Sequence, residues 1–477
     1  MQLSAALSES QVEAIDRAAF DLLERRGFRV MHEEALERLG KAGATVEASG
    51  LVRMPRSLMA ELLAQVPRTY QITGLDGIVR TIGGGEQYGN AIVTDPWIID
   101  YETGGPRRPR LEDLRRNTIV AQQLGHVAGI GRMDFPVTDV EGPASSHRAL
   151  LEHLLHHAKH YYVYVTSLES LDEWIEIGRV LTGGEGLRES STGRALFSTA
   201  VASLTPLTIT AMNVELLKTA CRYGMPVVPT VCPSAGTTSP HSLAGTLLVG
   251  HIECLMIAAL AQLYRPGHPF LYTFGPAVTD MRSGTCLYYT FDKVLWKYAH
   301  VQLAKAHNLP ASTECGGATT FRADAQHGAE GVLFMLAAAA SGADQINGFG
   351  STYNAIGHST EMMVIQSGWL ELARFLQRGI PTDPVRLAVE EIAAAGPGGH
   401  FMMDELTLRT MRGGEFATGE RLATDLFDWS GEPDGKPLME RAHEKVAAMV
   451  EGFESPVPIG IQEALRRHFR DRLGVRA

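Results

Sequence analysis

The sequence predicts an α/β fold, a (β/α)8 TIM barrel with an N-terminal helical cap and a C-terminal helical extension. Two observations predict it. Short runs rich in β-branched and aromatic residues alternate with long amphipathic helical patterns, and this alternation occurs eight times. An open doubly wound sheet would more often carry a glycine-rich phosphate fingerprint after its first strand, and Gly83-Gly84-Gly85 lacks that spacing. Eight units without the fingerprint favour a closed barrel.

The eight units can be placed in order along the chain. The strands are predicted at 89–94, 130–135, 161–166, 195–202, 225–231, 269–275, 311–315 and 344–350. The helices that follow them are predicted at 111–124, 145–158, 171–181, 207–223, 242–263, 291–307, 325–341 and 360–378. Ser170 to Glu173 is a capping-box sequence, and Gly224 and Gly342 stand where helices should end. In this fold, chemistry belongs to the loops that follow the strands.

The chain of 477 residues is longer than the roughly 250 of a typical barrel, so further segments are expected. Residues 1–70 form an N-terminal helical region that opens with a capping box at Ser10 to Glu13. Residues 71–88 form short strands and turns that lead into the barrel at 89–380, and residues 381–477 form a C-terminal helical extension. We expect these extensions to provide surface on which copies of the chain could pair.

Charge and composition exclude several classes of function. The formal net charge is −11 and no basic stripe is present, which argues against nucleic acid. The apolar helix at 247–263 contains His251, Glu253 and Gln262, so a barrel-wall helix is expected there and no membrane association. The first 30 residues lack the pattern of a secretory leader, and five cysteines at irregular spacing fit a reducing compartment. A cytoplasmic protein is therefore expected.

Three cysteines open one alternative. Cys232, Cys286 and Cys315 follow the fifth, sixth and seventh strands, and three thiolates around Zn²⁺ could activate a thiol for methyl transfer. The alternative is that they are small residues filling gaps. No Cys-x-Cys pair brings two ligands in from one loop, so gap filling is favoured and no metal is expected. His251 and Cys254 share a helix face outside the barrel, where core packing is favoured.

The loops after the last three strands carry aromatic and acidic residues. Tyr272 and Phe274 end the sixth strand, Glu314 ends the seventh, and Phe349 and Tyr353 follow the eighth. A quaternary ammonium ion donates no ordinary hydrogen bonds, so aromatic faces and carboxylates are what it binds. The pattern suits a cationic ligand, and the alternative is that these are the aromatic residues that any barrel has near its mouth.

Longer stretches carry a resemblance to a known family. Leu22–Val46, Val52–Pro55 and Leu63–Arg68 resemble the amino-terminal region of the trimethylamine methyltransferase family. The resemblance continues through Ser203–Leu207, Gly224–Pro229, Gly236–Thr238, Asp324–Glu330 and Gly342–Gly348. It covers nearly the whole chain and rests on composite signatures rather than on one short motif.

The resemblance implies a barrel that takes a methyl group from a methylated amine and delivers it to Co(I) of a separate corrinoid protein. It implies no tightly bound cofactor, since the cobalamin is supplied by that partner. The founding members use pyrrolysine, whereas all 477 residues here are standard. Members without pyrrolysine resemble glycine betaine methyltransferases, which act on quaternary amines. A quaternary nitrogen leaves as a neutral amine, so a strong nucleophile can attack its methyl group without prior covalent activation.

On this basis the candidate site residues receive roles. The catalytic candidates are Glu314, Asp324, Gln326 and His327. The cation pocket is assigned to Tyr272, Phe274, Phe349 and Tyr353, with Glu314 as the counter-charge, and a substrate carboxylate to Arg282, Arg322 or His358. Gly348 and Gly350 would let the backbone approach the ligand or the corrinoid. Helix capping is the alternative for Asp324, Gln326, His327 and Glu330, and a non-catalytic barrel that binds a quaternary amine is the alternative for the whole protein.

Overall fold

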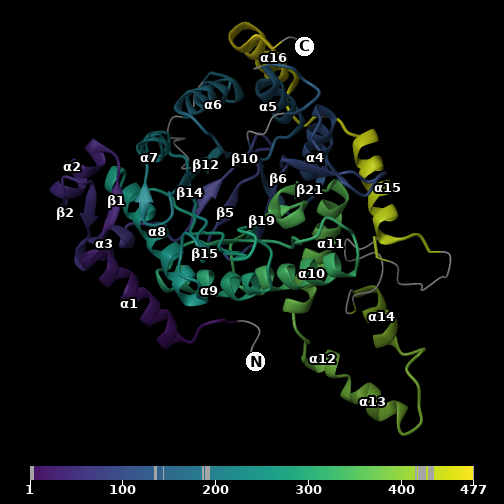
Figure 1. The fold of residues 1–477 in the computed structure, drawn as a ribbon. Helices are drawn as coiled ribbons and strands as arrows, with labels where there is room; N and C mark the ends of the chain where they lie inside the picture. The colour runs from purple at the N-terminus through teal and green to yellow at the C-terminus, as the bar shows by residue number, and fades with distance from the viewer. Residues whose placement is uncertain are drawn as a thin grey trace.

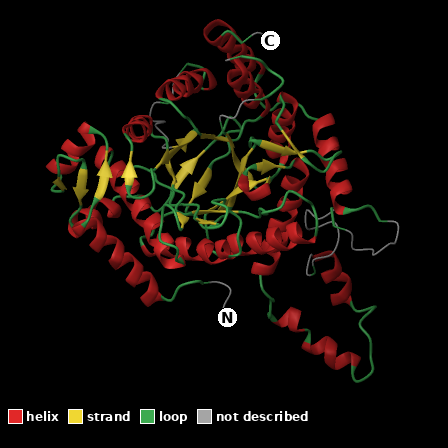
Figure 2. Cartoon of the chain, in the orientation of Figure 1, coloured by secondary structure: helices red, strands yellow, loops and turns green. Residues whose placement is uncertain are grey.

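The centre of the molecule is a curled, parallel β-sheet surrounded by helices (Figure 2). The computed structural model describes residues 5–133, 137–142, 144–184, 187, 194–413, 416, 426–427 and 435–475. Seven strands pair in the order β14-β12-β10-β9-β6-β19-β18. Their bounds are β6 (Tyr88–Ile92), β9 (Val127–Arg132), β10 (His160–Val163), β12 (Phe197–Ala202), β14 (Val227–Thr230), β18 (Ser312–Glu314) and β19 (Gln345–Phe349).

The segment around residues 270–272 closes this sheet into a barrel. Phe270 makes a parallel bridge to Val227 of β14, and Tyr272 makes one to Ala311, directly before β18. The amide of Leu271 donates to the Val227 carbonyl at 3.0 Å. The segment predicted as the sixth strand therefore joins the seven strands of the sheet and closes the barrel. The predicted fold class is confirmed.

Eight helices follow the eight strands and cover the outside of the barrel (Figure 1). They are α4 (Leu111–Gln123), α5 (Ala144–His156), α6 (Leu168–Leu181), α7 (Ala211–Tyr223), α8 (Leu243–Tyr264), α9 (Asp292–Ala306), α10 (Ala325–Ala340) and α11 (Thr360–Gln377). Neighbours pack along the ring from α6 to α11, and α11 packs on α4. Two further helices complete the layer, because α16 (Ile459–Leu473) packs on α5 and α6, and α15 (Leu438–Glu451) packs on α4 and α11.

The second strand shows the largest shift from its predicted position. It begins at Val127 rather than at residue 130, and residues 134–136 of the predicted strand lie outside the described part of the chain. Its interior face carries Gly129 and Gly131, where a Cβ atom would overlap the rings of Tyr162 and Tyr164. Large side chains on the neighbouring strand thus fill the barrel here, and this glycine-containing strand lacks the apolar run that marks a strand in sequence.

The N-terminal residues form helices and a small sheet beside α8 (Figure 1). The helices are α1 (Glu9–Arg25), α2 (Glu33–Lys41) and α3 (Arg56–Ala64), and the sheet has the order β13-β1-β3-β2. Its strands are β1 (Phe28–Val30), β2 (Thr45–Val46), β3 (Leu51–Arg53) and β13 (Thr208–Ile209). The predicted capping box at Ser10 is wrong by two residues, since Ser8 and Gln11 form it. The predicted box at Ser170 is also wrong, because Ser167 caps α6.

Short strands and three further helices complete the described chain. The short strands are β4 (Tyr70–Ile72), β5 (Arg80–Ile82), β7 (Trp97–Ile99), β8 (Pro106–Arg107), β11 (Arg194–Ala195), β15 (Ser234–Ala235), β16 (Ala277–Thr279), β17 (Cys286–Leu287), β20 (Ser351–Thr352) and β21 (Gly357–His358), with the 3-10 turn η1 (Tyr353–Ala355). The helices α12 (Pro384–Leu387), α13 (Val389–Ala395) and α14 (Glu405–Gly413) extend away from the barrel (Figure 1). The division into four segments stays a prediction.

Helix α8 is the most apolar element. In the described part of the chain it alone is long and apolar enough to span a membrane, yet 72% of its most apolar window is buried inside the structure. It packs against α1, α3, α7 and α9. Its apolar character therefore follows from its place between the barrel and the N-terminal helices, as predicted for a wall helix.

Candidate active site

The candidate site lies where the strands end. Parallel strands place their carboxyl ends on one face of a barrel, and side chains alternate between the interior and the helix layer. On β18, Ser312 points inward and accepts from Asn347 Nδ2 of β19 at 3.0 Å. Glu314, two residues later, therefore points into the mouth, where its side chain is 20% exposed. Cys315 points outward into the apolar layer beneath α10 and α11.

Glu314 is held by groups from the neighbouring unit. Its carboxylate lies 3.3 Å from Lys293 Nζ and 3.5 Å from Lys297 Nζ, and it accepts a hydrogen bond from the Tyr288 hydroxyl. Lys293 and Lys297 lie four residues apart in the first two turns of α9, so one helix face delivers both ammonium groups. The Lys293 ammonium also lies 3.1 Å from the centre of the Tyr288 ring. The result is a buried, charged cluster at the mouth.

The cluster holds two positively charged ammonium groups and one negatively charged carboxylate. Burial alone would raise the pKa of Glu314, but Lys293 and Lys297 outweigh it and lower that pKa to about 2. Burial lowers the pKa of Lys293 to about 8, against the opposing pull of Glu314. Two ammonium groups thus share one carboxylate. Glu314 is already neutralised by its own protein, which disagrees with its predicted role as the counter-charge of a substrate cation.

Asp95 is a second acid at the mouth, and it is differently placed. It follows β6, is 8% exposed, and lies 3.9 Å from the Nδ1 atom of His358. No hydrogen bond to its carboxylate occurs within the described ranges, and burial raises its pKa well above the ordinary value. Burial likewise lowers the pKa of His358 to about 3, and neither of its ring nitrogens has a hydrogen-bond partner there. An unpaired buried acid beside a neutral imidazole is a site prepared for a cationic group.

Tyr289 is a buried residue of the loop that follows the sixth strand. Its hydroxyl donates to Ser351 Oγ at 3.0 Å, and its pKa is raised by burial and then by the charges of Glu314 and Asp95. Asn354 fixes this loop, because its Oδ1 accepts from the Tyr288 amide at 2.7 Å and its Nδ2 donates to the Cys286 carbonyl at 2.6 Å. Loops from the sixth and eighth strands are therefore tied together around the mouth.

Three of the predicted aromatic ligands point away from the mouth. Tyr272 is fully buried and its hydroxyl lies 2.7 Å from His251 Nδ1 of α8, while Phe274 packs on Gly250 and on His300. Phe349 is buried in the apolar layer between the barrel and α11. Their predicted position in the cation pocket is wrong, because strand alternation directs these side chains to the helices.

The remaining predicted ligands lie on the rim. Tyr353 makes an edge contact with Phe321, with ring centres 5.2 Å apart, and the Arg322 guanidinium lies 5.2 Å from the Phe321 ring centre. Arg282 is exposed in a turn in which its amide donates to Asp280. The structure therefore joins Tyr353 with Arg322 through Phe321 and leaves Arg282 apart.

The predicted catalytic group at the start of α10 is occupied by structural contacts. Asp324 is the N-cap residue and accepts from the amides of Gln326 and His327 at 3.0 and 3.2 Å. Gln326 Nε2 donates to Glu330 at 2.9 Å, and Glu330 accepts from the Thr319 amide at 2.8 Å. These contacts match the helix-capping alternative.

The two candidate glycines have different surroundings. Gly350 has φ of +89°, and a Cβ atom there would overlap the His358 ring. Gly348 has φ of +87°, and a Cβ atom there would make an ordinary contact with Ser351 Cβ at 3.9 Å. Gly350 is therefore needed to seat His358, whereas Gly348 leaves room at the end of β19.

The cysteines do not gather around a common centre. Cys315 is buried in the outer layer, whereas Cys232 and Cys286 are exposed. Among the residues that the structure describes, the only group of three ligand atoms close enough to share an ion is Asp16, His251 and His307. The zinc-thiolate alternative is therefore contradicted.

Sequence reasoning missed five residues of the site. Their signals were present but weak: an acid directly after the first strand, a Tyr-Tyr pair in the loop after the sixth, and two lysines at helical spacing on the apolar α9. These residues are Asp95, Tyr288, Tyr289, Lys293 and Lys297. Buried acids, a neutral histidine and tyrosines at the mouth of a (β/α)8 barrel are typical of an enzyme active site.

Comparison with known proteins specifies that enzyme. The family model for trimethylamine methyltransferase (MTTB) matches residues 1–473, and the chain belongs to this family. It is 26% identical to trimethylamine methyltransferase MttB of Desulfitobacterium hafniense, over 97% of this chain and 92% of that protein. It is 25% identical to the glycine betaine methyltransferase of the same species, over 94% and 93%. The chain is a methyltransferase, as predicted.

A solved structure shows the same fold. The monomethylamine methyltransferase MtmB of Methanosarcina barkeri superposes with a TM-score of 0.53 at 12% identity, over 94% of this chain and 89% of that one. At this identity the likeness concerns the fold. It agrees with the barrel that the strand order and bridges define.

Proposed function

We propose that this methyltransferase transfers a methyl group from a quaternary amine, such as a betaine, to Co(I) of a corrinoid protein. The observation that carries the substrate class is Asp95, a buried carboxylate at the mouth without a hydrogen-bonding partner in the described chain. The relatives act on trimethylamine and on glycine betaine. All 477 residues here are standard, which favours the quaternary amine over the tertiary one.

The charges of the mouth suit this reaction. Asp95 supplies the negative charge for the ammonium group, because a bound cation favours the charged form of a buried acid. The substrate loses its positive charge as the methyl group leaves, so a site that binds the cation too strongly would raise the barrier. One free carboxylate, with Glu314 held by Lys293 and Lys297, limits that ground-state stabilisation. Lys293 and Lys297 together carry more positive charge than Glu314 neutralises, and we assign a betaine carboxylate to this side of the mouth.

The outer face of the mouth fits a protein partner. Four large apolar side chains on its βα loops are strongly exposed, with exposed fractions of 59% for Leu204, 66% for Met281, 59% for Phe291 and 42% for Ile356. An apolar rim around a catalytic mouth is typical of an interaction surface. A docked corrinoid protein would supply the Co(I) nucleophile, and the role of this chain is then to orient the N-methyl group and exclude water.

A direct assay tests the proposal. The full-length protein is mixed with Co(I) cobalamin under reducing conditions, and methyl-cobalamin formation is followed by absorbance with glycine betaine, carnitine, choline or trimethylamine. Transfer from at least one quaternary amine, and slower transfer from trimethylamine, is the expected result. Transfer from trimethylamine alone would contradict the substrate class. Binding of a quaternary amine without transfer to either free or protein-bound Co(I) would contradict the proposed reaction.

We also propose a cytoplasmic location. All five cysteines are free thiols, which fits a reducing compartment, and Co(I) chemistry requires such conditions. Pairing of copies through the terminal extensions stays a prediction.

A further inference from the structure

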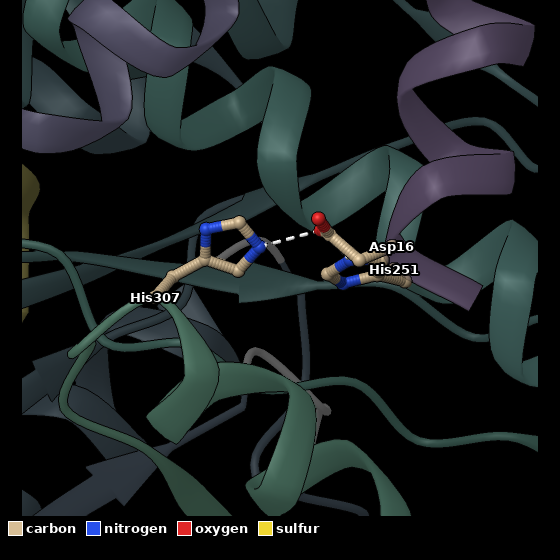
Figure 3. A group of neighbouring side chains, drawn as sticks. All are labelled: Asp16, His251 and His307. Carbon is tan, nitrogen blue, oxygen red and sulfur yellow. Dashed lines mark hydrogen bonds and ion pairs between the residues drawn. The ribbon is translucent and has the colours of Figure 1, made fainter. Parts of the chain in front are cut away.

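One cluster of ionisable side chains lies outside the barrel mouth, where three segments distant in sequence meet. Asp16 comes from α1, His251 from α8, and His307 from the C-terminal end of α9 (Figure 3). Helices of this fold run opposite to the strands, so the end of α9 lies away from the mouth. The cluster is therefore separate from the site that contains Asp95 and Glu314.

The three side chains aim their polar atoms at one another. Asp16 Oδ1 lies 2.6 Å from His307 Nε2 and 3.3 Å from His251 Nε2. All the possible ligand atoms lie within 4.8 Å of one another. The side chains are 28% exposed for Asp16, 16% for His307 and 0% for His251, so the group has a buried floor and an accessible side. One carboxylate and two imidazoles converging in this way form a chelating set.

We propose that Asp16, His251 and His307 bind a divalent transition-metal ion, Zn²⁺ in particular, with water in the fourth position. Imidazole and carboxylate ligands suit zinc, which takes them at tetrahedral geometry. Zinc–ligand bonds of about 2.0 Å place tetrahedral ligands about 3.3 Å apart. The separation from Asp16 to His251 has this value, and the separation from Asp16 to His307 requires an outward movement of the more exposed ring.

Tyr272 completes the site as an outer partner. Its hydroxyl lies 2.7 Å from His251 Nδ1, on the far side of the ring from Asp16. A ligating histidine commonly donates its second nitrogen to such a partner, which fixes the ring and directs the other nitrogen to the metal. This contact gives the hydroxyl of the outward-pointing Tyr272 a hydrogen-bonding partner. The ion would fasten the N-terminal helix α1 to two helices of the barrel wall.

Metal analysis of the full-length protein tests this site. The chain is purified without a polyhistidine tag, stripped with chelator, reloaded with Zn²⁺ and freed of excess metal before elemental analysis. About one zinc per chain is expected for the wild type, with a higher Tm in zinc than in chelator. Asp16→Asn and His307→Gln each remove one ligand while keeping a polar side chain, and both should lose the bound zinc and the shift in Tm.

Two further variants separate a metal site from a hydrogen-bonded cluster. Tyr272→Phe should bind zinc about 10- to 100-fold more weakly, as loss of an outer partner does. His468→Gln is the matched control, because His468 makes a 2.6 Å contact with Glu173 but belongs to no three-ligand group in the described chain. It should keep the zinc. A wild type that binds none, or zinc retained by both Asp16→Asn and His307→Gln, would overturn the proposal.

Discussion

Replacing Asp95 by Asn is the most direct test of the proposed substrate site. The change removes one negative charge and keeps the size of the side chain. At about 5 Å and an effective dielectric constant of about 20, two unit charges attract by about 3 kcal/mol. Loss of that attraction should weaken the binding of a quaternary amine roughly a hundredfold.

The pH dependence of binding gives a second readout of the same group. Burial raises the pKa of Asp95 in the free protein, whereas a bound cation favours its charged form. Binding therefore releases a proton. As the pH rises toward the raised pKa, the Kd of the wild type should fall by up to about tenfold per pH unit. The Asp95→Asn protein should lack this dependence.

The same pKa determines the effect on stability. Between the unfolded and the raised folded pKa, the folded protein keeps a proton that the unfolded chain has lost. The unfolding free energy that the protonated form of Asp95 contributes is present at low pH and is lost as the pH rises through the folded pKa of Asp95. The Asp95→Asn protein should therefore be more stable than the wild type in alkaline buffer, while it binds substrate less well.

Calorimetric titration of the full chain with glycine betaine, or with the amine found active in the transfer assay, measures all three effects across a pH series when combined with thermal unfolding. Asp280→Asn is the matched control, because Asp280 lies on the same face of the barrel and its carboxylate accepts from Ser283 and from the Arg282 amide. Equal losses of affinity in the two variants, or an unchanged pH profile in Asp95→Asn, would refute the reasoning.

Four other changes have distinct expected outcomes. Glu314→Gln leaves two buried ammonium groups without their carboxylate, so it should abolish methyl transfer and cost about 3–5 kcal/mol of unfolding free energy; a denaturant titration like that of the wild type would contradict this. Phe274→Leu should lower stability by about 1–2 kcal/mol with unchanged kcat, since the ring packs on α8; a large fall in kcat at full stability would return Phe274 to the site. Asp324→Ala removes a helix cap and should cost about 1 kcal/mol in urea unfolding, and loss of activity without loss of stability would show a catalytic role instead. Met281→Asp should slow transfer to a corrinoid protein but not to free cobalamin, and equal effects on both acceptors would argue against docking at the rim.

The barrel could be predicted because each of its units follows a local rule. All eight predicted strand regions contain a strand or, for the sixth, a bridged segment. The shifted second strand contains Gly129 and Gly131, whose role depends on tyrosines of the adjacent strand. A sequence pattern reports only the side chains of its own segment. The space above a glycine that a side chain of the adjacent strand fills is therefore not visible in the pattern.

The site was less predictable, since it depends on which way each side chain points. Tyr272 and Phe274 were correctly placed near the end of a strand, but the register that turns them toward α8 is set by the closed barrel. Glu314 was found, yet the lysines that neutralise it come from α9, the helix that precedes its strand. Asp95 lacks a motif, and its importance follows from burial and from the absence of a described hydrogen-bonding partner.

The segment around residues 270–272 makes one β-bridge to each neighbouring strand, and backbone hydrogen bonds of Pro269, Leu271 and Tyr272 accompany these bridges. Gly275 continues this segment, and a Cβ atom there would overlap the Tyr288 hydroxyl and the Glu314 carboxylate. This segment is paired at fewer positions than β10, so we expect its movement to cost less energy, and any such movement would change the width of the opening beside Glu314. The backbone amides of this segment should therefore exchange with deuterium sooner than those of β10 or β12, and a bound amine should slow that exchange.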